Sequence, residues 1–499
     1  MVHRTRGFPG RGCALRHLDP ARLIGSDLRS SPPGLASCSP RGIRARPGSP
    51  RRGRGCMTAP QQVLLTGGTV IDGTGSAARP ATDVLFEVDR ILAVGPAAAR
   101  VASPEAVTVD VSGLTVMPGL IDAHCHITFG EPASNDELFF HRHQSTAMLV
   151  AAFNVRKLLL AGVTGFLDAD CIFDLGPALR DAIDAGIVEG PRMTSGLNAL
   201  LTAAGGTAGR LIPDSGRLGY AHVMGDRAEM VRTTRQQIKE GADWIKIHVT
   251  GSLPRSNGEL TVWSLDELMA ITETAHALGT STVAHCRSAE STRLAALAGV
   301  DLILHASYLD AAAVEAVVDA RAAIAPTFTF LANLADHGHL VGASASQIDI
   351  FRGEIEATAD MLRIAHDAGV PILCGSESGF ALTPYGHWHA REMELLVDAM
   401  GLTPLEAITC ATRNGAIALR RPLDSVGVIA VDAAADILVV DGDPSTDVSI
   451  LGDRRRLRHV FSRGVAVDLD RPWPERQPLA GEKVAQWATQ PLTWDMVHR

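Results

Sequence analysis

The middle of the chain alternates short apolar segments with longer helical ones, and this alternation constrains the fold more than any other feature. The segments predicted to be strands are Leu114–Ala123, Val163–Leu167, Arg192–Ser195, Trp244–Val249, Ser281–Cys286, Leu302–Leu304, Ala323–Thr327 and Pro371–Gly375. The helical segments between them include Met148–Leu160, Ala228–Glu240, Leu265–Leu278, Ser288–Ala298 and Gln347–Ala368. Eight strands over about 300 residues predict an α/β protein with a (β/α)8 TIM-like barrel. An open doubly wound sheet is the alternative, but no Gly-x-Gly-x-x-Gly follows the first strand.

Both flanks of this region contain short apolar runs separated by turn residues, which is typical of β structure. The runs are Val63–Leu65, Thr69–Ile71, Asp83–Phe86 and Arg90–Val94 before the barrel, and Val426–Ile429, Ala435–Val440 and His459–Phe461 after it. We therefore predict a small β-sandwich domain built from residues 57–117 and 425–470. The barrel would span 118–424, and residues 471–499 would form a C-terminal tail.

Residues 1–56 differ in charge from the rest of the chain. They contain twelve arginines and only Asp19 and Asp27, a charge of about +10, so a net charge of -9 leaves about -19 for the remainder. An acidic body argues against nucleic acid as a partner. We expect this basic leader to be disordered and dispensable, because it lacks apolar periodicity. Met57 is the expected true start.

Two further compositional features concern the surroundings of the protein. No segment approaches the roughly 20 apolar residues of a membrane span, so no membrane association is expected. Five of the eight cysteines lie scattered in apolar segments after residue 56, without paired spacing. This pattern indicates buried thiols in a reducing compartment, and hence a cytoplasmic protein.

Polar side chains stand at the ends of the predicted barrel strands, where the chemistry of such barrels is located. They are His124, His126, Lys246, His285, His305 and Glu377. His124 and His126 are two apart on one strand and therefore face the same side. A lysine inside an apolar strand is costly unless it is paired or neutralised. Imidazoles and carboxylates suit Zn²⁺, with Co²⁺ or Mn²⁺ as alternatives, so one site with one or two divalent ions is predicted.

Five motifs carry a resemblance to a known family: Val116–His126 (VMPGLIDAHCH), Gly241–Ile247 (GADWIKI), Val283–His285 (VAH), Asp301–His305 (DLILH) and Leu402–Thr412 (LTPLEAITCAT). Together they resemble the amidohydrolase superfamily, and within it the imidazolonepropionase-like and Xaa-Pro dipeptidase-like metal-dependent hydrolases. The resemblance implies that His124 and His126 hold the more buried metal ion. It also implies that Lys246 is carbamylated and bridges to a second ion, held by His285 and His305.

Two departures from that family bear on function. The run Gly375–Gly379 (GSESG) carries Glu377 where the family usually has an aspartate. The longer glutamate could ligate metal and act as base, or it could handle only the proton. The second departure is Leu201–Gly206 (LTAAGG), where relatives often show Thr-Gly-Gly-His-Gly. Other residues predicted to contact substrate are Tyr220, His248 and His387.

The predicted function is hydrolysis of a C–N bond in a small molecule, an amide, cyclic amide, urea or carbamate, through a metal-activated hydroxide. Glu377 would carry the proton to the leaving nitrogen. A dipeptidase or N-acyl amino acid hydrolase is the second hypothesis, and it needs a cation for the substrate carboxylate: Arg210, Arg255, Arg287 or Arg391. The third is a binding or assembly protein that has lost catalysis. A homo-oligomer is expected.

Overall fold

The computed structural model describes residues 61–132, 143–206, 221–255, 257–477 and 490–498. All of them belong to one compact unit, residues 58–499. The basic leader and Tyr220 lie outside the described residues.

Parallel strands form the centre of the fold. A three-stranded sheet contains β6 (Leu120–Cys125), β7 (Val163–Asp168) and β8 (Arg192–Ser195). A six-stranded sheet has the order β10 (Ala221–Val223), β9 (Ala199–Leu201), β11 (Trp244–His248), β14 (Ser281–Cys286), β15 (Leu302–His305) and β16 (Ala323–Ala325). Most of the predicted strands are therefore confirmed within two residues.

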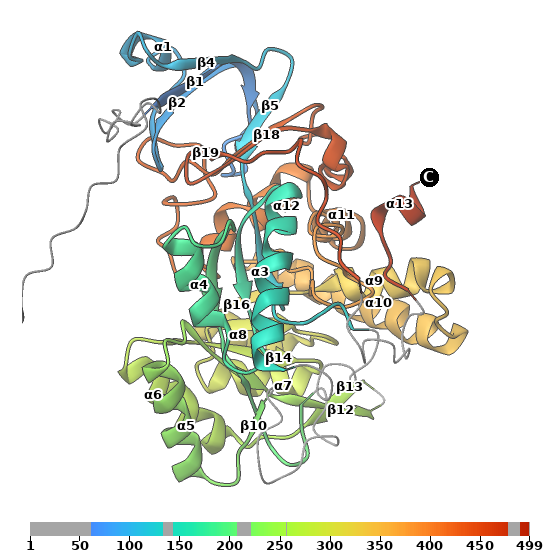
Figure 1. The fold of residues 1–499 in the computed structure, drawn as a ribbon. Helices are drawn as coiled ribbons and strands as arrows, with labels where there is room; N and C mark the ends of the chain where they lie inside the picture. The colour runs from blue at the N-terminus through green and yellow to red at the C-terminus, as the bar shows by residue number, and fades with distance from the viewer. Residues whose placement is uncertain (1–60, 133–142, 207–220, 256, 478–489, 499) are drawn as a thin grey trace, which may run out of the picture. The chain divides into compact units, whose positions relative to one another are not determined.

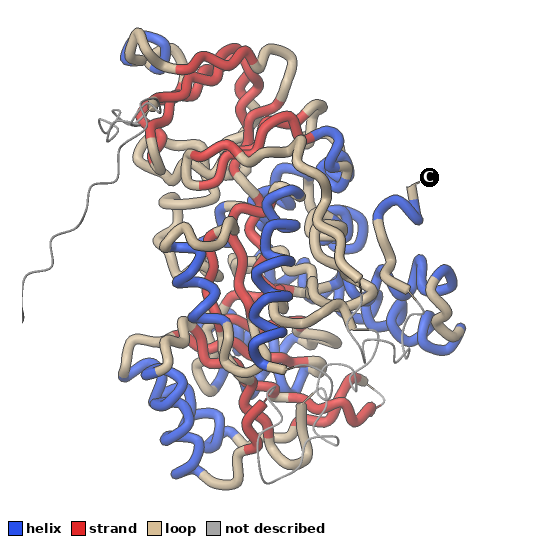
Figure 2. Tube along the Cα trace, viewed as in Figure 1, coloured by secondary structure: helices blue, strands red, loops and turns tan. Residues whose placement is uncertain are grey.

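Helices follow these strands along the chain and flank them in Figures 1 and 2. They are α3 (Gln144–Leu160), α4 (Gly176–Asp184), α5 (Arg227–Lys239), α6 (Leu265–Ala277), α7 (Ala289–Leu297), α8 (Ala311–Ala320), α9 (Phe328–His337), α10 (Ala345–Asp367), α11 (Arg391–Met400) and α12 (Pro404–Ala411). Side-chain caps fix several starts, because an oxygen there accepts an otherwise unpaired backbone N–H. Asp226 caps α5, and Ser264 forms a capping box with Glu267 in α6. The alternation is that of a TIM-barrel-like α/β fold.

The predicted strand Pro371–Gly375 is not found as a strand. Only single bridges occur there, between Ile324 and Ile372 and between Cys125 and Ser378. Backbone bonds nonetheless tie the segment to both neighbours: Leu373 N–H donates to Ile324 O over 2.8 Å, and Ala123 N–H donates to Cys374 O over 2.8 Å. A proline cannot donate to a ladder, and the positive φ of Glu377 (54°) turns the chain away, so pairing stays short.

The two β-rich flanks meet in one sheet, drawn in blue and red in Figure 1. Its eight strands are β1 (Gln62–Val70), β2 (Arg79–Glu87), β3 (Arg90–Val94), β4 (Val107–Asp110), β5 (Thr115–Pro118), β17 (Ile437–Val440), β18 (Leu457–Ser462) and β19 (Val465–Ala466). β5 joins the halves, because it pairs with both β1 and β17. The two runs predicted around Gly67 are one irregular strand, and Val426–Ile429 is not a strand. The expected sandwich is not resolved as two separate sheets among the described residues.

The first predicted strand, Leu114–Ala123, is divided at Gly119. Its first half, β5, lies in the eight-stranded sheet, and its second half, β6, begins the parallel strands. A Cβ at residue 119 would lie 2.0 Å from Thr164 Oγ1, so only glycine allows this close approach to β7. The apolar run could not reveal this change of sheet, because both halves are fully buried.

Shorter elements complete the described chain. They are α1 (Ala98–Val101), β12 (Thr250–Arg255), β13 (Gly258–Thr261), α13 (Trp494–Val497) and the 3₁₀ helices Gly338–Leu340, Arg413–Ala416, Val448–Gly452 and Arg454–Arg456. Among the described helices, none combines the length and apolar character needed to cross a membrane.

A buried ion pair links β8 to the chain just before β17. Arg192 Nε donates to Asp436 Oδ2 over 2.6 Å, and Asp436 Oδ1 accepts the N–H of Arg463 over 2.7 Å. Asp436→Ala would leave a buried guanidinium without this partner. Because Arg192 keeps the more exposed Asp89 as a second carboxylate partner, we expect a loss of about 3 kcal/mol in the free energy of unfolding in urea titrations, the lower end of the cost of breaking a buried pair. The exposed Asp319→Ala serves as control, and a loss below about 1 kcal/mol would assign the pair no more than a surface bridge's value.

Candidate metal centre

Five imidazole rings form a continuous arc at the carboxyl ends of the strands. His124 lies 4.9 Å from His126 and 5.2 Å from His305, measured between ring centroids. His305 lies 4.5 Å from His285, which stacks on His248 at 4.8 Å. All five side chains are buried. The four histidines predicted from the sequence are thus brought together, and His248 extends the row.

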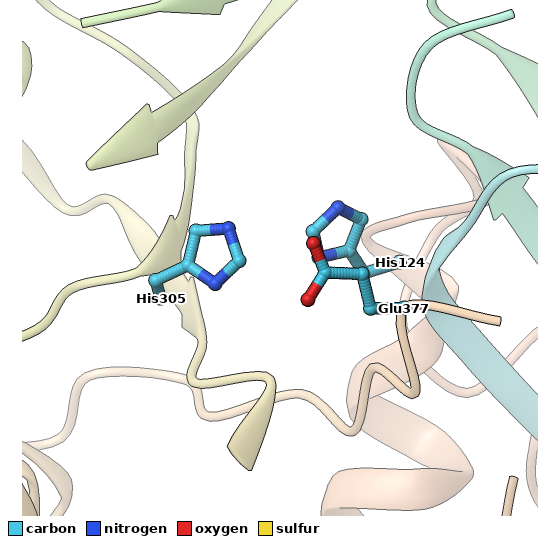
Figure 3. A group of neighbouring side chains, drawn as sticks. All are labelled: His124, His305 and Glu377. Atoms are coloured by element: carbon cyan, nitrogen blue, oxygen red, sulfur yellow. The ribbon is translucent and has the colours of Figure 1, made fainter. Parts of the chain in front are cut away.

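Glu377 joins this arc from the segment after Cys374. One side-chain donor atom from each of His124, His305 and Glu377 lies within 4.8 Å of the others, and Figure 3 shows the three side chains pointing toward one another. They come from β6, from β15 and from the segment that lies between β16 and β6. Two imidazoles and a carboxylate in a buried site are a donor set that suits a divalent metal ion.

Unusual backbone conformations occur where this site is built. His305, Thr327 and Glu377 have φ angles of 69°, 59° and 54°, in the left-handed region that costs energy for residues other than glycine. His305 is the last residue of β15, and Thr327 follows the end of β16 by two residues. Glu377 lies next to the bridge between Ser378 and Cys125. Such strain persists only where surrounding contacts hold it, and it is typical of functional sites.

The hydrogen bonds of three histidines define which ring nitrogen carries a proton. Thr327 Oγ1 donates to Ala325 O over 3.1 Å, so it accepts from Nδ1 of His124 at 3.0 Å. His126 Nδ1 faces Asp170 Oδ1 at 2.5 Å, and His285 Nε2 faces Glu259 Oε2 at 3.1 Å. Carboxylates only accept, so these nitrogens donate. The opposite nitrogen of each ring then carries a lone pair, which is the form that binds metal.

Burial lowers the pKa of both histidines in the donor group, His124 and His305. Desolvation, reinforced by the charge of Lys246, holds the pKa of His124 well below its usual value. Desolvation and the neighbouring His285 and His124 do the same for the pKa of His305. Since metal ligation requires the deprotonated ring, the site favours the ligating form at neutral pH.

Lys246 lies in the middle of β11 and is almost fully buried, at 1% exposure. Burial lowers its pKa, although the charges of Asp170 and Glu377 act in the opposite direction. Burial also raises the pKa of Glu377 to about 7, with His126, Arg287 and Lys246 opposing the shift. Lys246 therefore interacts electrostatically with both carboxylates. Its burial favours the neutral amine more than a position on the protein surface would.

Asp122 ties the His-x-His strand to the turn that carries Glu377. Its Oδ1 accepts the N–H groups of His124 (3.1 Å) and Ser376 (3.0 Å), and its Oδ2 accepts from His389 Nδ1 at 2.6 Å. His389 Nε2 accepts the N–H of Gly386 over 2.9 Å, which completes the network. The backbone of Glu377 donates to His124 O over 2.7 Å. These bonds hold His124 and Glu377 in fixed relation.

The three weaker sequence candidates have different outcomes. His248 is buried in the arc, where its Nε2 contacts Asp170 Oδ2 at 2.9 Å. His387 instead contacts the C-terminal segment, accepting from Trp494 N at 3.3 Å and packing on Trp473. The structure does not bring it to the donor group, because the chain after Glu377 turns toward those tryptophans. Tyr220 lies outside the described residues.

Sequence reasoning missed Asp170, Glu259, Thr327 and the Asp122–His389 pair. Asp170 follows β7 by two residues, so the strand-end rule that found the histidines could have found it. Glu259 contacts His285 across 26 residues from a hairpin, and Asp122 contacts His389 across 267. No local pattern predicts such contacts.

The residues present fit a divalent metal ion. Nε2 of His305 is buried and has no hydrogen-bond partner among the described residues, an arrangement that costs energy unless a ligand completes it. It lies in the cluster with His124 and Glu377. An uncompensated imidazole lone pair beside a carboxylate and further neutral imidazoles is the chemistry of a metal site.

Thr327→Val should test the outer contacts of this centre. The substitution keeps the shape and removes the hydroxyl that holds Nδ1 of His124. We expect metal affinity to fall about 10- to 100-fold, the usual cost of losing an outer partner of a ligating histidine. Competition titration with a chromophoric chelator measures it. The exposed Thr446→Val should match the wild type, and equal affinities for all three proteins would contradict the assignment.

The fold and this donor set define a TIM-barrel-like protein with a candidate divalent-metal centre. The model of the amidohydrolase family matches residues 115–467, so the chain belongs to the amidohydrolase family and is a hydrolase acting on C–N bonds. The chain is 27% identical to ochratoxinase of Aspergillus niger over 385 residues, 70% of this chain and 75% of that one.

Two solved structures are also similar to this chain. A prolidase complexed with N-methylphosphonate-L-proline has a TM-score of 0.71 and 27% identity, covering 82% of this chain and 99% of that chain. Phenylurea hydrolase B has a TM-score of 0.67 and 23% identity, covering 84% of this chain and 100% of that one. At that identity the second likeness concerns the fold alone.

Proposed function

We propose that this chain is a metal-dependent hydrolase of a small, uncharged amide, cyclic amide, urea or carbamate. The observation that carries the proposal is the buried donor group of His124, His305 and Glu377, in which Nε2 of His305 has no hydrogen-bond partner within the described part of the chain. The related proteins support C–N bond cleavage as the reaction class, since they include an ochratoxinase and a prolidase.

The proposed ligands are the six residues predicted from the sequence. His124 and His126 would hold one ion, His285 and His305 a second, with a carbamylated Lys246 between them and Glu377 within reach. Zn²⁺ is the expected ion, because the donors are mainly imidazoles. When bound, such ions polarise a carbonyl and lower the pKa of a water molecule.

Glu377 is the proposed proton carrier. Its carboxylate lies beside His124 and His305, and it belongs to a turn held by Asp122, Ser376 and the backbone of His124. It would accept a proton from the attacking water and return it to the leaving nitrogen as the C–N bond breaks. The products are then an acid and an amine.

Apolar side chains pack against His126, the ring next to His124, and would exclude water from this end of the site. Phe129 stacks on His126 at 4.5 Å, and Phe380 contacts both rings edge-on at 5.6 and 5.4 Å. Phe330 continues this cluster. Such a wall favours a substrate with an apolar acyl or aryl group.

The two candidate arginines that the structure describes, Arg287 and Arg391, support an uncharged substrate over an amino acid derivative. Arg287 is held by Glu354, with Nε to Oε1 at 3.0 Å, and faces Glu259 at 3.5 Å. Arg391 pairs with Asp336 at 2.7 Å and Glu394 at 3.4 Å. Both charges are already compensated, so neither offers an open site for a substrate carboxylate. Arg210 and the side chain of Arg255 lie outside the described part of the chain.

Substrate screening of metal-loaded enzyme tests the proposal. One arm contains neutral amides, ureas and carbamates, and the other contains dipeptides and N-acyl amino acids. We expect turnover in the first arm, abolished in His305→Ala and retained in the exposed His339→Ala. Turnover of the second arm alone would establish the amino acid hydrolase instead. Metal binding without turnover in either arm would favour the binding-protein hypothesis.

We also infer that the parallel strands close into an eight-stranded barrel. The segment 371–378 bonds to β16 on one side and to β6 on the other, and Asp243, just before β11, donates to Ser195 O of β8 over 2.9 Å. These bonds support continuity around a ring. The proposed domain limits remain 118–424 for the barrel, with 57–117 and 425–470 for the β domain.

A further inference from the structure

The hairpin of β12 and β13 is anchored to the end of β14, which carries His285. Val249 N–H, just before the hairpin, donates to His285 O over 3.0 Å, and Glu259 N–H donates to Arg287 O over 2.9 Å. Thr250 Oγ1 accepts the N–H of Arg287 over 3.3 Å. The backbone of Glu259 is therefore fixed relative to the ring of His285 before any side-chain contact is considered.

The side chain of Glu259 turns onto His285. Its Oε2 lies 3.1 Å from Nε2 of His285 and accepts from Thr250 Oγ1 over 2.7 Å. Glu259 is only 16% exposed and His285 only 8% at the side chain, so water competes little for this bond. Because the carboxylate accepts, Nε2 of His285 keeps its proton and Nδ1 keeps a lone pair.

A second layer holds Glu259 in turn. Arg287 places Nη1 3.5 Å from Glu259 Oε1, while its Nε bonds Glu354 Oε1 at 3.0 Å. Ser307, two residues after His305, donates to the same Oε1 of Glu354 over 2.6 Å. These contacts therefore connect Ser307, just after β15, through Glu354, Arg287 and Glu259 to His285 on β14. Two glutamates around one arginine leave a net negative charge beside that imidazole.

Gly258 makes the close approach feasible. Its φ is 108°, and a Cβ at this position would lie 2.0 Å from Arg287 O. A side chain at residue 258 would therefore push the hairpin away from β14 and lift Glu259 from His285. The glycine is thus a second, independent feature directed at the same contact.

We propose that Glu259 is a positioning residue of the metal centre, which orients His285 and fixes its tautomer so that Nδ1 faces a divalent metal ion. The inference rests on the proposed function, since it assumes that His285 binds metal. A carboxylate behind a ligating imidazole also increases the basicity of that ligand. Glu259 belongs to the hairpin after β11 and not to the end of a barrel strand. It would therefore be a determinant of metal affinity in addition to the six predicted ligands.

Metal titration of purified full-length protein tests this role. Zn²⁺ affinity is measured by chelator competition, the electronic absorption of the Co²⁺-loaded protein reports ligand geometry, and the melting temperature of the metal-free protein reports folding. We expect Glu259→Ala to weaken Zn²⁺ binding about 10- to 100-fold and to alter the Co²⁺ spectrum. Glu259→Gln keeps an acceptor without the charge, so its affinity should lie between those of Glu259→Ala and the wild type. The exposed Glu290→Gln is the matched control and should equal the wild type.

Gly258→Ala provides a variant that retains Glu259 but displaces it, and it should weaken Zn²⁺ binding in the same direction. Wild-type affinity in Glu259→Ala and Glu259→Gln would overturn the inference while leaving the proposed function intact. If Glu259→Ala lost its bound metal as completely as His285→Ala, Glu259 would be a direct metal ligand, and the positioning role would be wrong. A wild-type protein that binds no metal would instead refute the proposed function.

Discussion

Replacing Lys246 with alanine is expected to leave a folded protein that has lost its metal and its hydrolase activity. Lys246 is buried in β11, and its charge contributes to the lowered pKa values of His124, His285 and His305. If it is carbamylated, its removal deletes a shared anionic ligand, and the loss in affinity should exceed the roughly 10- to 100-fold cost of losing an outer partner. Metal analysis by mass spectrometry and activity assays provide the measurements.

Chemical rescue gives this experiment its specificity. Short carboxylates such as acetate or propionate, supplied with added metal, should restore part of the activity in Lys246→Ala, because they can occupy the vacated position. The exposed Lys239→Ala on α5 is the control and should resemble the wild type. Full activity in unrescued Lys246→Ala would falsify the carbamate bridge.

Glu377→Gln is expected to keep the fold and most of the metal while kcat falls about 10²- to 10⁴-fold, the usual scale for a general base. The amide is nearly isosteric with the carboxylate but cannot accept the proton. The backbone bonds of residue 377 to His124 and Thr383 do not depend on its side chain, so the turn should persist. Steady-state kinetics with metal content measured in parallel separates the two effects. Unchanged kcat would assign the proton to another group, with His248 the first candidate.

Glu377→Asp tests what the longer side chain does. If glutamate reaches the proton without ligating metal, aspartate should raise metal content and lower kcat. If glutamate simply replaces aspartate as a ligand, metal content should not rise. The positive φ at residue 377 is tolerated by aspartate at least as well as by glutamate, so backbone strain should not obscure the comparison.

The fold was largely predictable because its signals are local. The parallel strands β7, β11, β14 and β15 are short and mainly apolar, and helices α5, α6 and α7 begin at ordinary capping residues. Two failures have physical causes that local patterns hide. Gly119 passes the chain between two sheets within one continuous apolar run, and the segment after Pro371 bonds to its neighbours without forming a ladder.

The histidines of the site were predictable for the same reason, since each stands at the end of a parallel strand and such ends converge. Their outer partners were not. Asp122 meets His389 across 267 residues, and Thr327 meets His124 across 203. Those contacts exist only once the fold has brought the strand ends together. Asp170 is the exception, because its position after β7 obeys the rule that identified its neighbours.

Anomalous diffraction from crystals of the Zn²⁺-loaded protein, recorded at the zinc absorption edge, would locate the proposed metal centre. We expect one or two strong peaks at the donor group of His124, His305 and Glu377, with imidazole nitrogens at about 2.0–2.1 Å. If two ions bind, one peak should lie against His124 and His126 and the other against His285 and His305, with Lys246 between them. No peak at this group, or peaks only at surface residues, would contradict the assignment of a metal centre and with it the proposed hydrolase.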